Sequence, residues 1–321
     1  MMIGDLTFRQ AKRNDMPALL ALFKQLYPNL GWTSEFMRWQ YFDNPAGEAK
    51  VWICCDQEKP VGSVTALPHI IWTFDCQVVG YRVQDVMTAP EYRGLSIYKK
   101  LSERCYSFLD CQEMAVHFTF PNENSERVFR SSNWTPVSEI PLWTAQPLKK
   151  NKDFEVFDDI RLLENFSKEE EEIWSSYRKL DFFGIDKNQS FLNWKYFSNP
   201  RTNYQCYFID GRNTNVILVL KEFFFNASTT LIHICDLFYT EYCEDLLKGV
   251  FSFIHKKANI EKASTITTWI APNHELATVA SAMGFSYSPV TTRSYFLRSS
   301  NLKMHDYFSK WNIRMGDSDV Y

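Results

Sequence analysis

The sequence predicts an α/β protein that consists of two similar tandem domains. Its 321 residues exceed the usual size of one domain, and strand-like and helix-like segments alternate along the chain. The segment "FMRWQYFDNP" (Phe36–Pro45) returns as "FLNWKYFSNP" (Phe191–Pro200), at a shift of 155 residues (191 − 36 = 155). A weaker match relates Phe120–Trp134 to Ala271–Phe285, at a shift of 151 residues (271 − 120 = 151). Two matches at nearly the same shift indicate a duplication, so we expect domains over residues 1–145 and 154–321.

The first domain is predicted to begin with a strand at Leu6–Gln10, after which Asn14 or Asp15 caps a helix with apolar periodicity. Two more helices are expected to start near Ser96 and Glu123. Apolar and β-branched runs predict five further strands, at Val51–Cys55, Val61–Leu67, His69–Asp75, Val83–Thr88 and Met114–Phe120.

The second domain is predicted to repeat this pattern. It begins with a strand-like run at Phe154–Asp159, and Ser167 with Glu170 is typical of a capping box that opens a helix. The polar stretch Thr144–Asp153, which contains a proline, is typical of a linker between the domains.

Composition excludes several classes of protein. With 45% hydrophobic and 16% aromatic residues the chain can fill substantial cores. A net charge of −3 argues against a mainly nucleic-acid-binding function. No apolar run approaches the length that spans a bilayer, and the N-terminus lacks the features of a secretory signal. Eight cysteines without C-x-x-C spacing indicate reduced thiols and no zinc site, so we expect a cytoplasmic protein without a metal.

The stretch "DVMTAPEYRGLSIYKKL" (Asp85–Leu101) combines a strand, a short loop with Arg93-Gly94 and the start of a helix. The first N–H groups of a helix have no intrahelical partner, and with the helix dipole they favour a bound phosphate or pyrophosphate. The alternative is an ordinary strand–helix turn that holds no ligand. The loop alone does not distinguish these two interpretations.

Together with "HFTFPNENSERVFRSSNW" (His117–Trp134), this stretch resembles the GNAT superfamily of acetyl-CoA-dependent N-acyltransferases, which have a mixed α/β sheet. The resemblance covers most of the first domain. The family loop reads Gln/Arg-x-x-Gly-x-Gly/Ala, often within Pro-x-Tyr-Arg-Gly. Pro90, Tyr92, Arg93 and Gly94 match it, whereas Ser96 and Tyr98 stand where the family has small residues.

The resemblance implies acetyl-CoA as co-substrate. The backbone of Arg93, Gly94, Leu95, Ser96, Ile97 and Tyr98 would hold its pyrophosphate, and Asn122 would bond its pantetheine arm. An N–H near Met87 or Thr88 would polarise the thioester carbonyl. A left-handed backbone at Ser96 would be strained. We expect instead that Ser96 lies in the first helical turn, because serine is a preferred residue at helix starts.

Two side chains are candidates for the general base. Asp85 occupies the strand position where the family often has a carboxylate, and a purely structural carboxylate is the alternative. His117 is the second candidate, although a lone strand histidine is more often a core residue. Many members of the family use a tyrosine as the general acid, and Phe129 occupies that position here. Another group, or solvent, would then protonate the thiolate, or the domain binds acyl-CoA without turnover.

Trp39 and Tyr41 are candidates for an acceptor pocket, but their recurrence in the second domain favours a core role. The second domain has Glu244-Asp245 where the first has Arg-Gly, and acidic residues there would repel a pyrophosphate. We therefore predict a catalytically silent second domain. We expect an N-acetyltransferase that acts on a small amine, such as an amino sugar or sugar nucleotide. The alternative is a non-catalytic acyl-CoA-binding or scaffold protein. The sequence predicts no oligomeric state.

Overall fold

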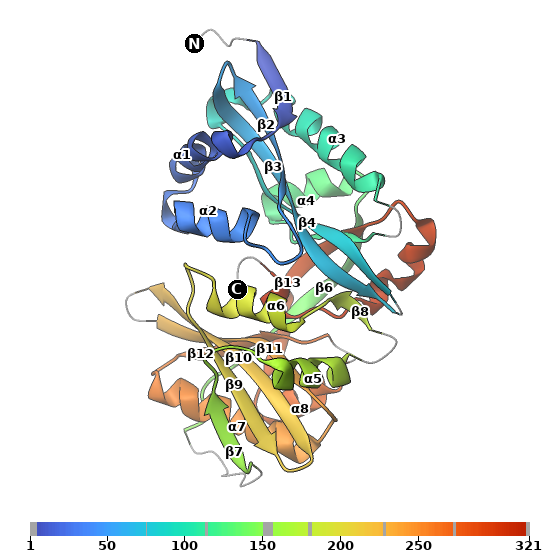
Figure 1. Ribbon diagram of the computed structural model, residues 1–321. Coiled ribbons are helices and arrows are strands. Elements are labelled where there is room, and N and C mark those ends of the chain that lie inside the picture. Colours follow the sequence, from blue (N-terminus) through green and yellow to red (C-terminus); the bar gives the residue numbers. More distant parts are fainter. Residues whose placement is uncertain are drawn as a thin grey trace.

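The computed structural model describes residues 5–74, 76–112, 115–149, 157–178, 182–226, 229–271 and 274–318. Within these residues, thirteen strands form one mixed sheet that runs through both halves of the molecule. The strand order is β1-β2-β3-β4-β5-β13-β6-β12-β11-β10-β9-β7, and β8 pairs with β3. Figure 1 shows the two halves one above the other, with helices packed against the sheet. The predicted mixed α/β class is confirmed.

The first half contains the elements that surround the loop with Arg93-Gly94. They are β1 (Leu6–Gln10), η1 (Arg13–Asp15), α1 (Met16–Leu26), η2 (Pro28–Leu30), α2 (Ser34–Tyr41), β2 (Lys50–Asp56), β3 (Lys59–Thr73), β4 (Cys76–Thr88), η3 (Pro90–Tyr92), α3 (Ile97–Asp110), β5 (His117–Thr119), α4 (Glu123–Arg130) and β6 (Thr135–Ala145).

The second half contains a similar series followed by a C-terminal segment. Its elements are β7 (Asp159–Leu162), α5 (Lys168–Tyr177), β8 (Phe183–Ile185), α6 (Gln189–Leu192), η4 (Asn193–Phe197), β9 (Tyr204–Gly211), β10 (Thr214–Asn226), β11 (Thr229–Tyr239), α7 (Glu244–Ile260), β12 (Thr265–Trp269), α8 (Leu276–Ala282), β13 (Ser286–Arg298), η5 (Leu302–Lys310) and η6 (Met315–Asp317).

Several local predictions are confirmed. The first strand covers Leu6–Gln10, and helices begin at Ile97 and Glu123. Ser167 and Glu170 form the predicted capping box, with the Ser167 N–H donating to Glu170 Oε2 over 2.7 Å. Such caps depend on residues three positions apart, so they can be recognised from sequence.

The prediction of two strands at Val61–Leu67 and His69–Asp75 is wrong, because β3 is one strand that passes through Pro68; Asp75 lies outside the described residues. β2 pairs with β3 only as far as Ala66. Beyond that point β3 has no β2 neighbour, so a proline costs no hydrogen bond on that side.

The start of the predicted linker also differs from the prediction. The expected linker begins with Thr144, but Thr144 and Ala145 are the last residues of β6. The next strand, β7, starts at Asp159, and half of the predicted strand at Phe154–Asp159 falls on residues 154–156, which lie outside the described residues.

β6 and β13 each cross from one half of the sheet to the other. β13 lies between β5 and β6 in the first half, where Phe296 pairs with Thr119. The end of β6 lies between β12 and β13 in the second half, where Ala145 pairs with Ile266. Each half of the sheet is therefore completed by a strand from the other half.

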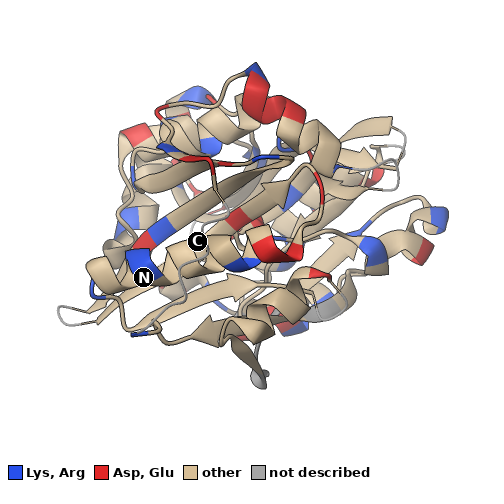
Figure 2. Ribbon diagram, turned by 90° about the horizontal axis from the view of Figure 1, so that it is seen from below, with Lys and Arg blue, Asp and Glu red and all other residues tan. Residues whose placement is uncertain are grey.

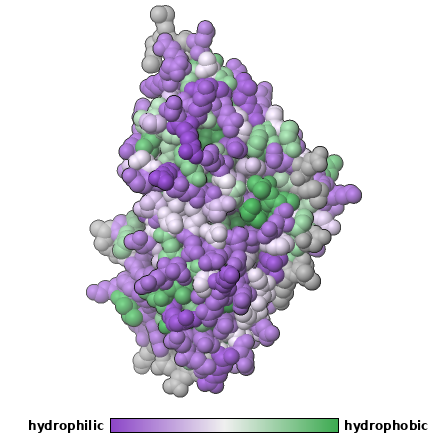
Figure 3. Space-filling view, in the orientation of Figure 1, coloured by the Kyte–Doolittle hydropathy of each residue, from purple (hydrophilic) through white to green (hydrophobic). Residues whose placement is uncertain are grey.

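The surface carries both signs of charge. Figure 2 shows Lys and Arg interspersed with Asp and Glu rather than gathered on one face of this view. Figure 3 shows a mainly hydrophilic face with a hydrophobic patch beside β4, the strand that carries the 40% exposed Val79. All eight cysteines are free thiols. Among the described residues, no helix has the length and apolar character needed to cross a membrane. The same residues contain no group of three potential metal ligands.

Candidate active site

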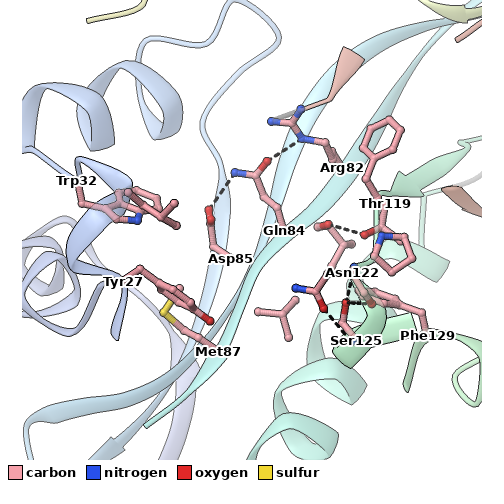
Figure 4. A pocket seen from close by; sticks show the side chains of 15 residues that line it. Tyr27, Trp32, Arg82, Gln84, Asp85, Met87, Thr119, Asn122, Ser125 and Phe129 are labelled. Carbon is pink, nitrogen blue, oxygen red and sulfur yellow. Dashed lines mark hydrogen bonds between the residues drawn. The ribbon is translucent and has the colours of Figure 1, made fainter. Parts of the chain in front are cut away.

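A cavity of about 220 Å³ opens in the first half where β4 and β5 separate. The two strands pair in parallel only at Arg82 and Phe118, and β4 then continues along β3. Figure 4 shows the cavity between the segment after α1 and the start of α4. Its lining residues are Tyr27, Leu30, Trp32, Arg82, Val83, Gln84, Asp85, Val86, Met87, Thr119, Phe120, Pro121, Asn122, Ser125 and Phe129.

A β-bulge turns Asp85 toward this cavity. Ser63 pairs with Met87 and Thr65 with Gln84, so one residue of β3 faces two residues of β4. Asp85 has a left-handed backbone with φ +50°, which is unfavourable for a residue with a side chain. The Ser63 hydroxyl donates to the Asp85 carbonyl over 2.9 Å. Backbone strain of this kind is held in place by its surroundings and is frequent at functional sites.

The Asp85 carboxylate is held by two donors. The Tyr41 hydroxyl donates to Oδ2 over 2.7 Å, and the Gln84 amide donates to the same oxygen over 2.9 Å. Gln84 in turn accepts a hydrogen bond of 2.7 Å from Arg82 Nε. Figure 4 shows Arg82, Gln84 and Asp85 joined in series along β4. The series fixes the direction in which the carboxylate points.

Tyr41 and Trp39 do not line this cavity. Tyr41 is 1% exposed, and burial together with the Asp85 charge raises the pKa of its hydroxyl well above the usual value, so it acts as a donor. Trp39 is buried against Trp194 of the second half. Both residues are part of the core, and Trp39 also lines a separate hollow together with Trp194. Their assignment to an acceptor pocket stays a prediction, and this cavity does not support it.

The Tyr–Asp contact of the first half has a counterpart in the second. The Tyr196 hydroxyl donates to Asp236 Oδ2, and these residues follow Tyr41 and Asp85 by 155 and 151 positions (196 − 41 and 236 − 85). In the second half, the cavity beside Asp236 measures only about 10 Å³, and a separate cavity of about 650 Å³ opens between Tyr239 and Glu275. The Tyr–Asp contact therefore occurs in both halves, whereas among the described residues the space beside the aspartate is open in the first half.

The loop between β4 and α3 has an unusual backbone at two positions. Gly94 has φ +85°, and a Cβ placed there would meet open space. Ser96 is the N-cap of α3 with φ +57°, and its side chain makes no capping hydrogen bond. The expectation that Ser96 lies in the first helical turn is wrong. The turn requires a left-handed residue there, so serine carries the strain that glycine would avoid.

The loop nevertheless suits an anion. The first turn of α3 contains no acidic residue, and its N–H groups have no intrahelical partners. The Tyr92 hydroxyl donates to Asp56 Oδ2 over 2.7 Å, which anchors the loop on β2. The segment from Arg93 to Tyr98 thus presents a helix start that can accept a phosphate group.

Asn122 and Phe129 lie on the α4 side of the cavity (Figure 4). Asn122 Oδ1 accepts from the Ser125 N–H, and Ser125 Oγ accepts from the Asn122 N–H, both over 3.0 Å. Asn122 therefore caps α4. Phe129 is 2% exposed and packs edge-on against Trp134, so the position that bears a tyrosine in the family has no hydroxyl here.

His117 does not reach the cavity, which corrects its candidacy as the base. Its side chain is fully buried, and Nε2 lies 3.1 Å from the Leu109 carbonyl of α3. Burial lowers its pKa to about 4, so the ring is neutral near pH 7. The alternative of a core histidine fits this geometry.

Sequence reasoning missed the wall opposite Asn122, which is formed by Tyr27, Leu30 and Trp32. Tyr27 and Trp32 lie on either side of η2, which contains Leu30, and Pro28 and the left-handed Gly31 separate α1 from α2 there. The signal in the sequence is "YPNLGW", in which a proline and a glycine interrupt the helical pattern. The side chain of Tyr27 is 41% exposed, and Figure 4 shows it beside Met87.

In the part of the second half that the structure describes, the matching helix start is acidic. Helix α7 follows Cys243 and carries Glu244 and Asp245 in its first turn. Lys187 stands 155 positions after Trp32 (187 − 32 = 155) and forms ion pairs with Asp236 and Asp317. A buried lysine thus stands at the sequence position that corresponds to Trp32, whose aromatic side chain lines the cavity of the first half.

Comparisons with known proteins agree with this geometry. Residues 7–137 match the profile of the acetyltransferase (GNAT) domain. A GCN5-related N-acetyltransferase from Anabaena variabilis has a similar fold, with a TM-score of 0.68 and 13% identity over 93% of this chain and 74% of that chain. No curated protein matches the sequence significantly.

Two further solved structures share the fold. A conserved protein of unknown function from Enterococcus faecalis, described as a probable N-acyltransferase, has a TM-score of 0.70 and 14% identity over 93% of this chain and 73% of that chain. Eis1 from Mycobacterium abscessus has a TM-score of 0.57 and 12% identity over 92% and 73%. At these identities the likeness establishes the fold and not a shared substrate.

Proposed function

We propose that the protein transfers an acetyl group from acetyl-CoA to the amine of a small molecule, because residues 7–137 match the acetyltransferase (GNAT) domain profile. The observation that carries the proposal is the cavity at the separation of β4 and β5, adjoined by the strand–loop–helix segment that suits a pyrophosphate. A bound thioester there would have its reacting end beside Asp85 and Met87.

The residues present fit acetyl-CoA as co-substrate. The backbone from Arg93 to Tyr98 would hold the pyrophosphate, because no carboxylate opposes it in the first turn of α3. Asn122 lines the same cavity and would contact the pantetheine arm. The backbone N–H of Met87 or Thr88 would polarise the thioester carbonyl.

Acyl transfer then needs a base for the amine and a proton for the leaving thiolate. We propose that Asp85 accepts the proton of the attacking amine, while the new C–N bond forms and the C–S bond breaks. Phe129 cannot supply the thiolate with a proton. Tyr27 presents a hydroxyl in the same cavity and is the best-placed donor, and it regains its proton from solvent.

The acceptor is proposed to be small and polar. The cavity volume of about 220 Å³ is below the range of roughly 300–1,000 Å³ that is common for ligand pockets. Its wall combines the aromatic Tyr27 and Trp32 with the polar side chains of Arg82, Gln84 and Asp85. An amino sugar or its nucleotide, with hydroxyl groups around one amine, offers matching hydrogen-bonding groups.

We further propose that the chain is a tandem GNAT protein whose second domain, over residues 154–321, is catalytically silent. The repeated element order and the Tyr196–Asp236 contact support the duplication. The closed space beside Asp236 and the acidic start of α7 support the loss of cofactor binding.

The proposal is tested by the release of free thiol from acetyl-CoA in the presence of a panel of amino sugars, polyamines and aromatic amines. Acetylation of one class of amine would support the proposed activity. The rate should fall at least tenfold when Tyr27→Phe and Asp85→Asn are combined. Binding of acetyl-CoA without any acceptor-dependent release would favour the non-catalytic alternative, which the strained Ser96 and the absent hydroxyl at Phe129 also favour.

A further inference from the structure

We propose that the second half positions the active site of the first half through the C-terminal segment, with Lys187 and Arg82 as positioning residues. This inference rests on the proposed acetyl transfer and gives the silent half a role in it. The path runs from a buried cluster in the second half (Lys187, Tyr196, Asp236 and Asp317), through the Asp317 carbonyl, to Arg82 of β4.

The buried cluster holds the C-terminal segment in place. The side chains of Lys187, Asp236 and Asp317 are 4%, 0% and 1% exposed. Lys187 Nζ contacts Asp236 and also Asp317 Oδ1 at 2.9 Å, so one ammonium group joins a carboxylate of β11 to a carboxylate of η6. Removing one member of such a buried ion cluster leaves uncompensated charge, which is strongly unfavourable.

The segment also fits closely against the cluster. A Cβ added to Gly316 would overlap the Tyr196 hydroxyl and would lie 2.8 Å from Asp236 Oδ2. The Arg314 N–H donates to Asp317 Oδ2 over 2.8 Å, which closes the turn at η6. The position of the Asp317 carbonyl is therefore set by second-half residues.

That carbonyl reaches the wall of the first-half cavity. Arg82 Nη1 donates to the Asp317 carbonyl over 3.0 Å, and Arg82 is 5% exposed. Its Nε donates to Gln84, whose amide donates to Asp85 Oδ2. A nearby contact, from Lys195 Nζ to the Ser318 carbonyl at 3.0 Å, fastens the same segment a second time.

A displacement of the segment would therefore change the active site without touching it. If the Asp317 carbonyl moves, Arg82 loses a partner that fixes its guanidinium plane, and Gln84 loses the orientation that aims its amide at Asp85. A carboxylate that is mispositioned by as little as about 1 Å can lose much of its catalytic effect, of the order of a hundredfold. The acetyl-CoA loop at residues 93–98 takes no part in this path.

The test is a double-mutant cycle of Lys187→Met and Arg82→Lys, with kcat and the KM for acetyl-CoA measured for each variant. We expect each single variant to lower kcat at least tenfold while the KM for acetyl-CoA changes less than threefold. The kcat of the double variant should lie within about threefold of the kcat of the less active single variant, because both changes break one path. Lys248→Met is the matched control, since Lys248 pairs with Glu244 on the surface of α7 and should keep wild-type kcat.

Wild-type kcat in folded Lys187→Met, or multiplicative effects in the double variant, would overturn the inference while the proposed function stands. An inactive wild-type protein would overturn both. If Lys187→Met does not fold, Lys187→Arg and Arg82→Lys decide the matter. Lys187→Arg retains the charge and should restore activity in part, whereas an Arg82→Lys variant with unchanged kcat contradicts the path.

Discussion

Trp39 and Trp194 donate hydrogen bonds to each other's backbone. Trp39 Nε1 lies 2.8 Å from the Trp194 carbonyl, and Trp194 Nε1 lies 3.0 Å from the Trp39 carbonyl. Their rings stack at 4.7 Å with 15° between the planes. The two residues hold the same place in the repeated segment, 155 positions apart (194 − 39 = 155). The repeat therefore meets itself where the two halves join.

This reciprocal pair predicts the effect of Trp39→Phe. The change removes the donor to the buried Trp194 carbonyl, which should lower the free energy of unfolding by about 1–3 kcal/mol. Trp311→Phe is the control, because Trp311 is also buried and its N–H has no hydrogen-bond partner among the described residues. Chemical denaturation should show the larger loss of unfolding free energy for Trp39→Phe.

The wild-type protein should unfold in one transition, because β6 and β13 join the two halves of the sheet. Two separate transitions in chemical denaturation would contradict this.

Ser96→Gly should maintain or raise stability. Glycine avoids the left-handed penalty of about 1–2 kcal/mol at φ +57°, while the greater entropy of the unfolded chain offsets roughly 0.5–1 kcal/mol of the gain. Ser107→Gly, an exposed change within the same helix, should lower the melting temperature. Thermal unfolding of both variants makes the comparison. A Ser96→Gly variant less stable than Ser107→Gly would show that the left-handed turn is not strained.

Acetyl-CoA should bind once per chain. At about a hundred times its dissociation constant the ligand should add roughly 2.7 kcal/mol of stability. Titration calorimetry should give a stoichiometry near one, because within the described residues the first half alone combines an open cavity beside the aspartate with a helix start free of acidic residues. Gly94→Glu and Ser96→Asp should abolish the binding. A stoichiometry near two, or binding that survives both changes, would place the cofactor in the other half.

Asp85→Asn should lower turnover more than it lowers the melting temperature. Asparagine keeps the size of the side chain and can still accept from Tyr41 and Gln84, but it lacks the charge that a base requires. Tyr41→Phe, which removes one of these donors, is the companion variant. Full activity with reduced stability in Asp85→Asn would mean that the carboxylate is structural, as its counterpart Asp236 is.

His117 should make the protein less stable in acid. Its pKa is about 4 in the folded protein and about 6.5 in an unfolded chain, so below pH 6.5 the unfolded state binds the proton first. Stability is therefore lost as the pH falls from about 6.5 to 4, and the loss from this residue reaches about 1.4 kcal/mol at pH 5.5. His117→Gln should reduce the difference in unfolding free energy between pH 7.5 and 5.5. An unchanged pH dependence would show that His117 is accessible to protons when folded.

The sequence by itself determined the features that depend on neighbouring residues. The repeated segments "FMRWQYFDNP" and "FLNWKYFSNP" are visible in the sequence itself and predict a duplication. The order of strand, loop and helix at Asp85–Leu101 and the cap at Ser167 follow from local backbone preferences. The acidic start of α7 could be read directly from Glu244 and Asp245.

Tertiary structure decided the rest. The exchange of β6 and β13 pairs Phe296 with Thr119, and the Arg82–Asp317 contact spans 235 residues. The left-handed backbone at Ser96 is set by the loop that the two flanking elements impose, against the residue's own preference. Contacts between residues distant in sequence leave no periodic or spaced pattern, because they result from how whole strands and helices pack. Local sequence therefore predicted the strand, the loop and the helix start beside the cavity, and packing between the halves determined which side chains complete the cavity wall.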